Sequence, residues 1–278
     1  MKDDDCVRFL QEVLPRLDLR WPGFRKVRGQ VCKRLARRLI ELDLPDLAGY
    51  RQLLAARPAE WEILDSLCRI SISRFHRDRR CFEELAGEVL PEIVRQAQAT
   101  GGPVRIWSAG CASGEEPYTL ALLWHFRGHD RAGPALSITA TDVDPVLLAR
   151  ARTGCYPESS LRELPGPWLA AAFSRRDASF CLRPEFTAGV EFIRQDLRDG
   201  APAGPFHLAA CRNLAFTYFA GPLQHEVLAR LAAALAPGGF LMIGHTEALP
   251  AGQELFAPFR GRRGLYRQIS PASGKNTS

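Results

Sequence analysis

The first part of the chain shows apolar residues at helical spacing. Val31, Leu35, Leu39 and Leu42 follow one another at intervals of four, four and three residues, so they form one apolar stripe along a helix. Further helices are predicted over 47–56, 61–68 and 82–98, the last ending near the Gly-Gly-Pro turn at 101–103. The pattern therefore predicts an all-helical N-terminal module.

From Val104 onward, short apolar runs alternate with helical stretches. Strands are predicted over 104–109, 136–141, 190–193, 207–211, 240–244 and 265–269, and helices over 115–126, 145–152 and 223–235. Such alternation favours an α/β fold with a mostly parallel sheet covered on both faces. The stretch 153–189 is rich in proline and glycine and breaks the alternation, so we interpret it as an inserted, small antiparallel subdomain.

Length and composition agree with two modules, at 1–80 and 81–278. An apolar fraction of 46% is enough for packed cores, and only the small polar tail 270–278 suggests disorder. Met1 is followed by a lysine and three aspartates, which is not a signal peptide, and no apolar run could span a bilayer. We expect a cytoplasmic protein without membrane insertion.

The excess positive charge lies in the first module. Residues 1–80 hold 18 Lys+Arg and 12 Asp+Glu, whereas residues 81–278 hold 19 of each. Eight basic residues and no acidic one lie between Arg20 and Arg38. The segment is interpreted as a docking surface for an acidic protein or, alternatively, as a solvated helix face. Nucleic acid is unlikely as a partner, because Trp21 and Phe24 are the only aromatics there and no RNA-binding motif is present.

Eight cysteines are scattered along the chain without a CxxC pair, which argues against a zinc ribbon or a redox motif. No metal site is expected, and the cysteines are predicted to be reduced and buried.

The first strand of the α/β module runs into a loop of small residues. Gly110 and Gly114 lack Cβ atoms, so a ligand can approach the backbone closely. The loop does not match GxGxxG, and Glu115 and Glu116 at the helix start would repel a pyrophosphate. They suit S-adenosylmethionine, which carries an ammonium and a sulfonium and no phosphate. For a lone loop of this kind, the alternative is an ordinary strand–helix turn.

The other predicted strands also end in polar residues. Asp142 is placed to bind a ribose diol, although it could instead cap the helix that starts at Pro145. The third strand leads to Asp196-Leu197, and the fourth to the segment Cys211-Arg212-Asn213. In open α/β sheets, ligands lie beyond the carboxyl ends of the strands, so these segments are predicted to converge on one site.

Five ordered segments resemble the CheR family of chemotaxis receptor methyltransferases, over about residues 23–267. The family's segments TxFFRD, WSAGCSTGEEPYS, ATDID, CRNVLIYF and PGGxLxxGHSE correspond to Ser73–Asp78, Trp107–Tyr118, Ala140–Asp144, Cys211–Phe219 and Pro237–Glu247. The resemblance implies a class I, Rossmann-like methyltransferase with a mostly parallel seven-stranded sheet, a substrate-docking helical domain and a small β-subdomain. It also implies methyl transfer from S-adenosyl-L-methionine to glutamate carboxylates of a chemoreceptor-like protein, leaving S-adenosyl-L-homocysteine.

The resemblance also assigns residues to roles. Arg77 and Tyr218 would be the catalytic residues, nearest the transferred methyl group. The predicted cofactor-binding set is Ser71, Ser73, Arg77, Gly110, Glu115, Asp142, Asp196, Leu197, Cys211, Arg212 and Asn213. His245 and Glu247 match the family and are interpreted as structural residues at the edge of the sheet.

Three positions depart from the family pattern. His76 stands in place of phenylalanine, and Asp196 stands in place of the usual asparagine. Four residues separate Asn213 from Tyr218 where the family has three. The extra residue motivates an alternative function, methylation of a small molecule or of another protein acceptor. A binding module that senses S-adenosylmethionine is a separate alternative.

Overall fold

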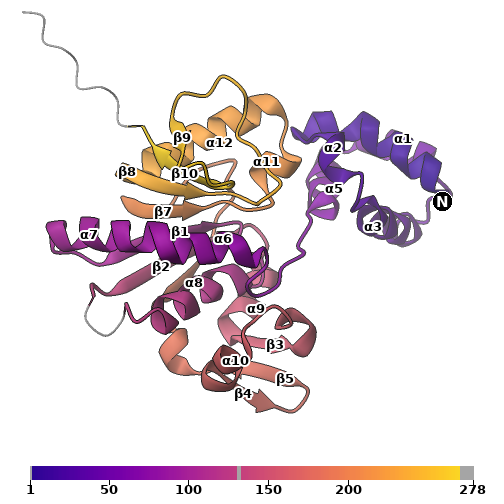
Figure 1. The fold of residues 1–278 in the computed structure, drawn as a ribbon. Helices are drawn as coiled ribbons and strands as arrows, with labels where there is room; N and C mark the ends of the chain where they lie inside the picture. The colour runs from indigo at the N-terminus through magenta and orange to yellow at the C-terminus, as the bar shows by residue number, and fades with distance from the viewer. Residues whose placement is uncertain (1, 130–132, 270–278) are drawn as a thin grey trace, which may run out of the picture. The chain divides into compact units, whose positions relative to one another are not determined.

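The computed structural model describes residues 2–129 and 133–269. The tail predicted to be disordered, 270–278, lies outside the described residues. The chain divides into two compact units (Figure 1). The helical unit comprises the chain up to Ser71 together with Thr217–Leu223, and the α/β unit comprises Ile72–Phe216 and the chain from Gln224 onward. The sequence pattern had suggested residue 80 as the boundary.

The helical unit contains the helices that the apolar spacing predicts. Its elements are α1 (Asp3–Val13), η1 (Leu14–Leu17), α2 (Trp21–Phe24), α3 (Arg28–Glu41), α4 (Leu47–Ala56) and α5 (Ala59–Cys68). Val31, Leu35 and Leu39 are buried on α3, which confirms three positions of the predicted stripe, but the fourth, Leu42, follows the end of the helix and is only half-buried. The Asp46 side chain accepts a hydrogen bond from the backbone N–H of Gly49 and so caps the start of α4.

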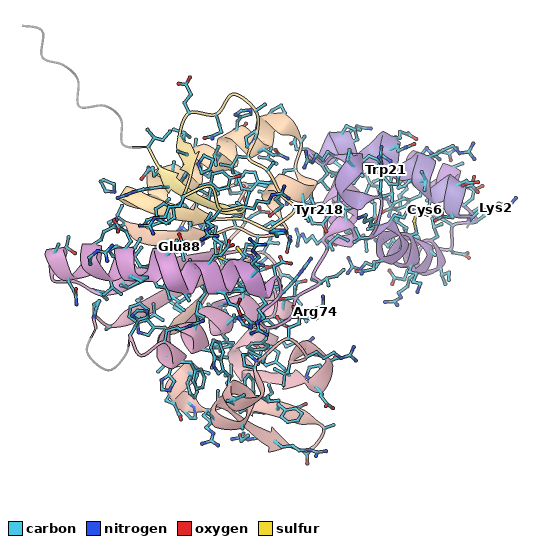
Figure 2. All side chains as sticks on the ribbon, viewed as in Figure 1. Lys2, Cys6, Trp21, Arg74, Glu88 and Tyr218 are labelled. Carbon is cyan, nitrogen blue, oxygen red and sulfur yellow. A yellow bond between two sulfur atoms is a disulfide. The ribbon has the colours of Figure 1, made fainter. Side chains whose placement is uncertain are left out.

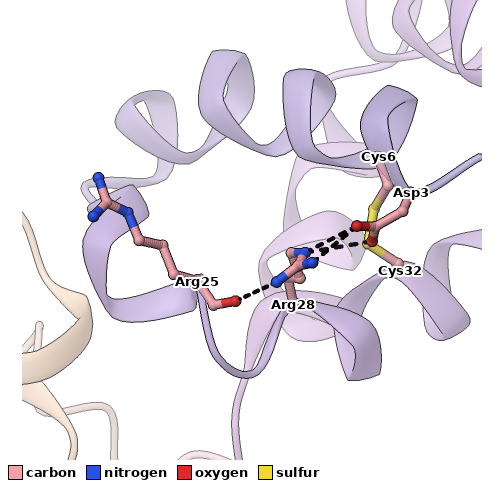
Figure 3. The surroundings of a disulfide bond; sticks show 5 residues. All are labelled: Asp3, Cys6, Arg25, Arg28 and Cys32. Carbon is pink, nitrogen blue, oxygen red and sulfur yellow. Dashed lines mark hydrogen bonds and ion pairs between the residues drawn. A yellow bond between two sulfur atoms is a disulfide. The ribbon is translucent and has the colours of Figure 1, made fainter.

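Two disulfides correct the prediction that all cysteines are reduced. Cys6 on α1 is bonded to Cys32 on α3, and beside this bond Arg28 forms an ion pair with Asp3 (Figure 3). Cys155 is bonded to Cys181 in the α/β unit. The spacing of cysteines cannot show such pairs, because each joins residues that only the fold brings together. The other four cysteines are free and buried, as predicted.

The described strands of the α/β unit form a seven-stranded sheet in the order β6-β2-β1-β7-β8-β10-β9. The strands are β1 (Val104–Ala109), β2 (Leu136–Asp142), β6 (Val190–Arg194), β7 (Phe206–Ala210), β8 (Leu235–Met242), β9 (Phe256–Pro258) and β10 (Leu265–Gln268). The pairs from β6 to β8 are parallel, and β10 runs antiparallel to both β8 and β9. The predicted sheet is confirmed, although β9 was not anticipated and β8 starts five residues early.

Alternating residues of the strands pack against helices. Ile106, Leu208 and Phe240 lie in one buried cluster with apolar residues of α6 (Arg79–Glu84), η2 (Leu85–Val89), α7 (Leu90–Thr100) and α8 (Glu115–Phe126). Figure 1 shows α6 and α7 running across this face of the sheet. The single helix predicted over 82–98 is interrupted by the π turn η2, because Pro91 has no N–H to bond the carbonyl one turn earlier.

The remaining helices are α9 (Pro145–Thr153), α11 (Ala215–Tyr218) and α12 (Gly221–Ala234). The inserted segment forms a second, three-stranded antiparallel sheet in the order β3-β5-β4, which confirms the predicted appendage. Its strands are β3 (Cys155–Pro157), β4 (Phe173–Arg176) and β5 (Ser179–Leu182), with α10 (Gly166–Ala172) and the short turns η3 (Glu158–Ser160) and η4 (Pro184–Phe186). Among the described residues, no helix is long and apolar enough to cross a membrane.

Candidate functional site

The carboxyl ends of four neighbouring strands meet at one edge of the sheet. β6, β2, β1 and β7 are parallel and adjacent, so the residues that follow them share that edge. The strand order reverses at β1, which has β2 on one side and β7 on the other. Open α/β sheets bind ligands at such a reversal. The predicted convergence of the strand ends is therefore confirmed.

The loop after β1 needs its glycines for packing as well as for ligand approach. Gly110 and Gly114 have positive φ values of 77° and 92°. A Cβ on Gly110 would lie 2.3 Å from a Leu214 methyl group, and one on Gly114 would lie 2.9 Å from the Tyr156 hydroxyl oxygen. The Tyr156 hydroxyl also donates a hydrogen bond to the Ser113 carbonyl at 2.7 Å, so the inserted subdomain anchors this loop. No local signal in the sequence identified Tyr156.

Asp142, at the end of β2, holds the loop that follows β1. Its Oδ2 accepts from the Ala112 N–H at 2.8 Å, and its Oδ1 accepts from the Asp144 N–H at 2.9 Å. The alternative that Asp142 caps the next helix is wrong, because Asp144 caps α9 by accepting from the N–H groups of Val146 and Leu147.

Two carboxylates begin α8, where the helix dipole favours negative charge. Glu115 is buried, and both of its oxygens lie within 2.9 Å of the Ser113 hydroxyl, which donates to them. Glu116 accepts from the Ser108 hydroxyl at 2.8 Å and lies 3.3 Å from Arg212 Nη1. Burial raises the pKa of Glu116, and the Arg212 charge opposes that shift.

The segment after β6 is closed on itself by an ion pair. Asp196 accepts from the backbone N–H of Arg198 at 2.9 Å and pairs with its guanidinium at 2.7 Å. Leu197 is buried, and its carbonyl accepts from Arg230 at 3.2 Å. The carboxylate that stands in place of the family's asparagine thus has a cationic partner within its own turn.

The segment after β7 is held by Glu247. Cys211 is fully buried, and burial raises the pKa of its thiol. Asn213 adopts a left-handed conformation with φ of 54°, and its N–H donates to Glu247 Oε2 at 2.7 Å. The Gly244 N–H donates to the same oxygen at 2.7 Å. Glu247 is structural, as predicted, but it ties the ends of β7 and β8 together, and β8 is not an edge strand.

The remaining predicted residues divide between the two units. Ser73 and Arg77 belong to the α/β unit, where Arg77 Nη1 donates to the Ile72 carbonyl at 2.8 Å. Ser71 and Tyr218 belong to the helical unit. Tyr218, labelled in Figure 2, accepts from the Arg20 N–H through its carbonyl at 2.8 Å, and its ring lies 5.1 Å from that of Phe24.

The residues at the sheet edge fit S-adenosylmethionine better than a phosphate ligand. Glu115 and Asp142 offer carboxylates for an ammonium or a diol, whereas the arginines described nearby, Arg198 and Arg212, are paired with carboxylates. When bound, this cofactor supplies an electrophilic methyl group.

A parallel sheet that reverses at β1, a glycine loop and carboxylates at the strand ends define an S-adenosylmethionine-dependent methyltransferase. The model of the family described as CheR methyltransferase, SAM binding domain, matches residues 71–265. The chain therefore belongs to the CheR methyltransferase family, and its cofactor is S-adenosylmethionine.

Two chemotaxis protein methyltransferases support this assignment. A probable chemotaxis protein methyltransferase of Rhizobium etli is 34% identical over 225 residues, which cover 78% of this chain and 83% of that protein. The chemotaxis protein methyltransferase of Escherichia coli K12 is 31% identical over 231 residues, covering 79% and 76%. An uncharacterized 104.1 kDa protein of Rhodobacter capsulatus is 36% identical over 251 residues, covering 90% of this chain but 26% of that protein. The chain thus spans about a quarter of that relative's length.

Among solved structures, the N-methyltransferase NodS of Bradyrhizobium japonicum WM9, in complex with S-adenosyl-L-homocysteine, is 17% identical. The match covers 64% of this chain and 66% of that chain, with a TM-score of 0.34.

Proposed function

We propose that this protein transfers methyl groups from S-adenosylmethionine to glutamate carboxylates of a chemoreceptor-like signalling protein. The observation that carries the proposal is the convergence of four parallel strand ends, which brings Glu115, Asp142 and Arg212 to one edge of the sheet in a chain of the CheR family. In this proposal Arg77 contributes to cofactor binding as well, together with Ser71, Ser73, Gly110, Glu115, Asp142, Asp196, Leu197, Cys211 and Asn213.

The chemistry needs little from the protein beyond positioning. A glutamate side chain has a reference pKa of about 4.3, so it is already an ionised nucleophile at neutral pH and requires no general base. Catalysis then consists mainly of in-line alignment and partial desolvation of two opposite charges. Arg77 orients the acceptor carboxylate, and Tyr218 lines the transfer axis.

The basic segment Arg20 to Arg38 is proposed to dock the acidic acceptor protein. Some of its arginines are used internally: Arg28 pairs with Asp3, and Arg38 pairs with Glu60. Lys33 and Arg37 are exposed, four residues apart on α3, and form no ion pair with any residue that the structure describes. One turn further along this face, Ile40 is 80% exposed. This face suits an acidic helix that carries an apolar residue.

A methylation assay tests the proposed function. Purified protein, labelled S-adenosylmethionine and a chemoreceptor cytoplasmic fragment should yield methyl esters that mild alkali releases. Arg77→Ala should abolish the label, whereas Arg79→Ala, at an exposed neighbour paired with Glu83, should not. Label that resists mild alkali, or label that Arg77→Ala leaves intact, would contradict the proposal.

A second assay tests the docking surface. Lys33→Ala combined with Arg37→Ala should raise the KM for the receptor fragment about tenfold, in the range expected for losing two interfacial charges, without changing cofactor affinity. Arg57→Ala, an exposed arginine outside the segment, is the matched control. An unchanged KM in the double variant would locate docking elsewhere.

A cytoplasmic location is part of the proposal, because the acceptor segments of a chemoreceptor lie there.

One feature favours a different acceptor as the second candidate. The extra residue before Tyr218 lies in α11, and Tyr218 is fixed by its carbonyl to the Arg20 N–H. A changed position of Tyr218 would suit another protein side chain or a small molecule. Methylation of a protein-free cell extract would support this candidate, and strict dependence on a receptor protein would remove it.

A further inference from the structure

A buried ion network in the α/β unit joins three segments that are distant in sequence. Arg212 follows β7, Glu116 lies in the first turn of α8, and Asp78 immediately precedes α6. Arg212 Nη2 donates to Asp78 Oδ2 at 2.8 Å, and its Nη1 lies 3.3 Å from Glu116 Oε2. The same Nη2 also donates to the Arg77 carbonyl at 2.8 Å. One guanidinium therefore holds both residues of the Arg77-Asp78 pair.

The Arg212 side chain is enclosed. It is 4% exposed, and its guanidinium carbon lies 4.7 Å from the centre of the Phe82 ring. Ser108 fixes Glu116 from the other side by donating to Oε1 at 2.8 Å. Burial raises the pKa of Glu116, so its ionised form depends on the Arg212 charge. The planar fork of an arginine can serve two carboxylates and a carbonyl together, which a lysine ammonium does less well.

The turn that Arg212 holds is strained. His76 and Asp78, on either side of Arg77, have φ values of 55° and 62°, in the left-handed region. Such conformations persist where the surroundings over-determine them. The His76 N–H donates to Thr119 Oγ1 at 3.0 Å on one side of Arg77, and Arg212 bonds the other side.

We propose that Arg212 is a positioning residue for methyl transfer: its side chain fixes the strained turn at residues 76–78 and so sets where the Arg77 guanidinium stands. This differs from the cofactor contact that the resemblance implies for Arg212, because its Nη1 and Nη2 are directed at Glu116, Asp78 and the Arg77 carbonyl, while its Nε is buried with no hydrogen-bond partner among the described residues. The proposal rests on the proposed function, in which Arg77 orients the acceptor carboxylate.

Hydrogen exchange without any ligand tests the clamp separately from the function. In Arg212→Met the amide of His76 should exchange about tenfold faster than in the wild type, since the turn loses its charge-assisted bonds. Asp78→Asn, at a side chain that is 33% exposed, should fold normally and give a smaller increase. The control Arg262→Met removes a partly buried ion pair with Glu88 in the same unit and should leave the His76 amide unchanged. Unchanged exchange in both Arg212→Met and Asp78→Asn would overturn the proposal, whatever the protein's activity.

A double-mutant cycle then tests whether Arg212 acts through Arg77. Calorimetry with S-adenosyl-L-homocysteine should show about tenfold weaker binding for Arg77→Ala and for Arg212→Met, and the double variant should bind no more weakly than the weaker single variant. Arg212→Lys should recover part of the loss in affinity and in kcat. If the double variant instead bound the ligand about a hundredfold more weakly than the wild type, the two losses of affinity would multiply, and Arg212 would act independently of Arg77. If the wild type ignored this ligand, the proposed function would fail, while the exchange result would still decide on the clamp.

Discussion

Each compact unit pairs an arginine with a largely buried glutamate, and the two pairs are built differently. In the helical unit, Arg38 contacts both oxygens of Glu60 at 2.9 Å, and the Tyr50 hydroxyl donates to one of them at 2.8 Å. In the α/β unit, Glu116 Oε2 lies 3.3 Å from a single nitrogen of Arg212, Nη1.

The difference is visible in the proton affinities of the two carboxyls. Hydrogen bonding from Arg38 lowers the pKa of Glu60, whereas burial raises the pKa of Glu116. Arg38 also pairs with Glu41, but it meets both oxygens of Glu60, whereas Arg212 offers Glu116 one nitrogen at 3.3 Å. A bidentate arginine offsets the cost of burying a carboxylate better than a single long contact does. The helical pair therefore serves stability, while the pair at the strand ends gives up stability because Arg212 also holds the Arg77 turn.

The two disulfides, one in each compact unit, should show the largest effects on stability. Each closes a loop with a sequence separation of 26, so chain entropy predicts the same stabilisation of about 3.5 kcal/mol in each unit. Cys6→Ser with Cys32→Ser should cost about that much in chemical denaturation. The control Cys68→Ala removes a free, buried thiol of the same unit and should cost less. Thiol titration of unfolded, unreduced protein should find four thiols, against eight after reduction; eight thiols before reduction would exclude both bonds.

Neutralising Glu60 should give the next largest effect. Glu60→Gln removes the charge from a saturated, buried site and should lower stability by about 2 kcal/mol at pH 7. Because the folded-state pKa of Glu60 is lowered, its contribution is present above the ordinary pKa of 4.5 and is lost as the pH falls through the folded-state pKa. Denaturation measured between pH 3 and 8 should show that the wild type loses its extra stability over Glu60→Gln as the pH falls. Glu62→Gln, exposed on the same helix, should show no such trend.

The matched substitution in the α/β unit, Glu116→Gln, should have a smaller effect on stability, and this effect should depend on pH in the opposite direction. Glu116→Gln should alter stability by about 1 kcal/mol or less, since the amide can still accept from Ser108 and carries no buried charge. Because burial raises the folded-state pKa of Glu116, its ionisation costs stability as the pH rises above the ordinary pKa of 4.5. The glutamine variant should therefore gain on the wild type from pH 4 to 8. Parallel slopes for the two glutamine variants would refute the comparison.

His76 offers the smallest expected effect. Its ring is buried beside Trp168, and Nε2 has no hydrogen-bond partner among the described residues. Burial lowers the pKa of His76, so the wild type loses stability as the pH falls through the ordinary pKa of 6.5. His76→Phe should change the free energy of unfolding by only about 0.5 kcal/mol at pH 8. The substitution removes a buried nitrogen that has no hydrogen-bond partner among the described residues, but it places a bulky side chain at a positive φ, and the two effects offset each other. In thermal melts, the stability of His76→Phe relative to the wild type should increase when the pH is lowered from 8 to 5.5. A stability difference that does not depend on pH would contradict this account.

The sequence by itself determined the elements and the edge at which the site lies. The spacing of Val31, Leu35 and Leu39 defines α3, and the bounds of β1 and α8 agree with the pattern to the residue. These features are local, because side-chain periodicity and small residues after a strand act over a few neighbouring positions. Parallel strands then bring their ends together without further information.

Only the tertiary structure decided how the charged and sulfur-bearing residues pair. Arg212 and Asp78 are separated by 134 residues, and Cys155 meets Cys181 because β3 and β5 lie opposite each other in register. The antiparallel β9 likewise depends on its pairing with β10. Such contacts depend on the arrangement of whole elements, and no pattern within a single element encodes them.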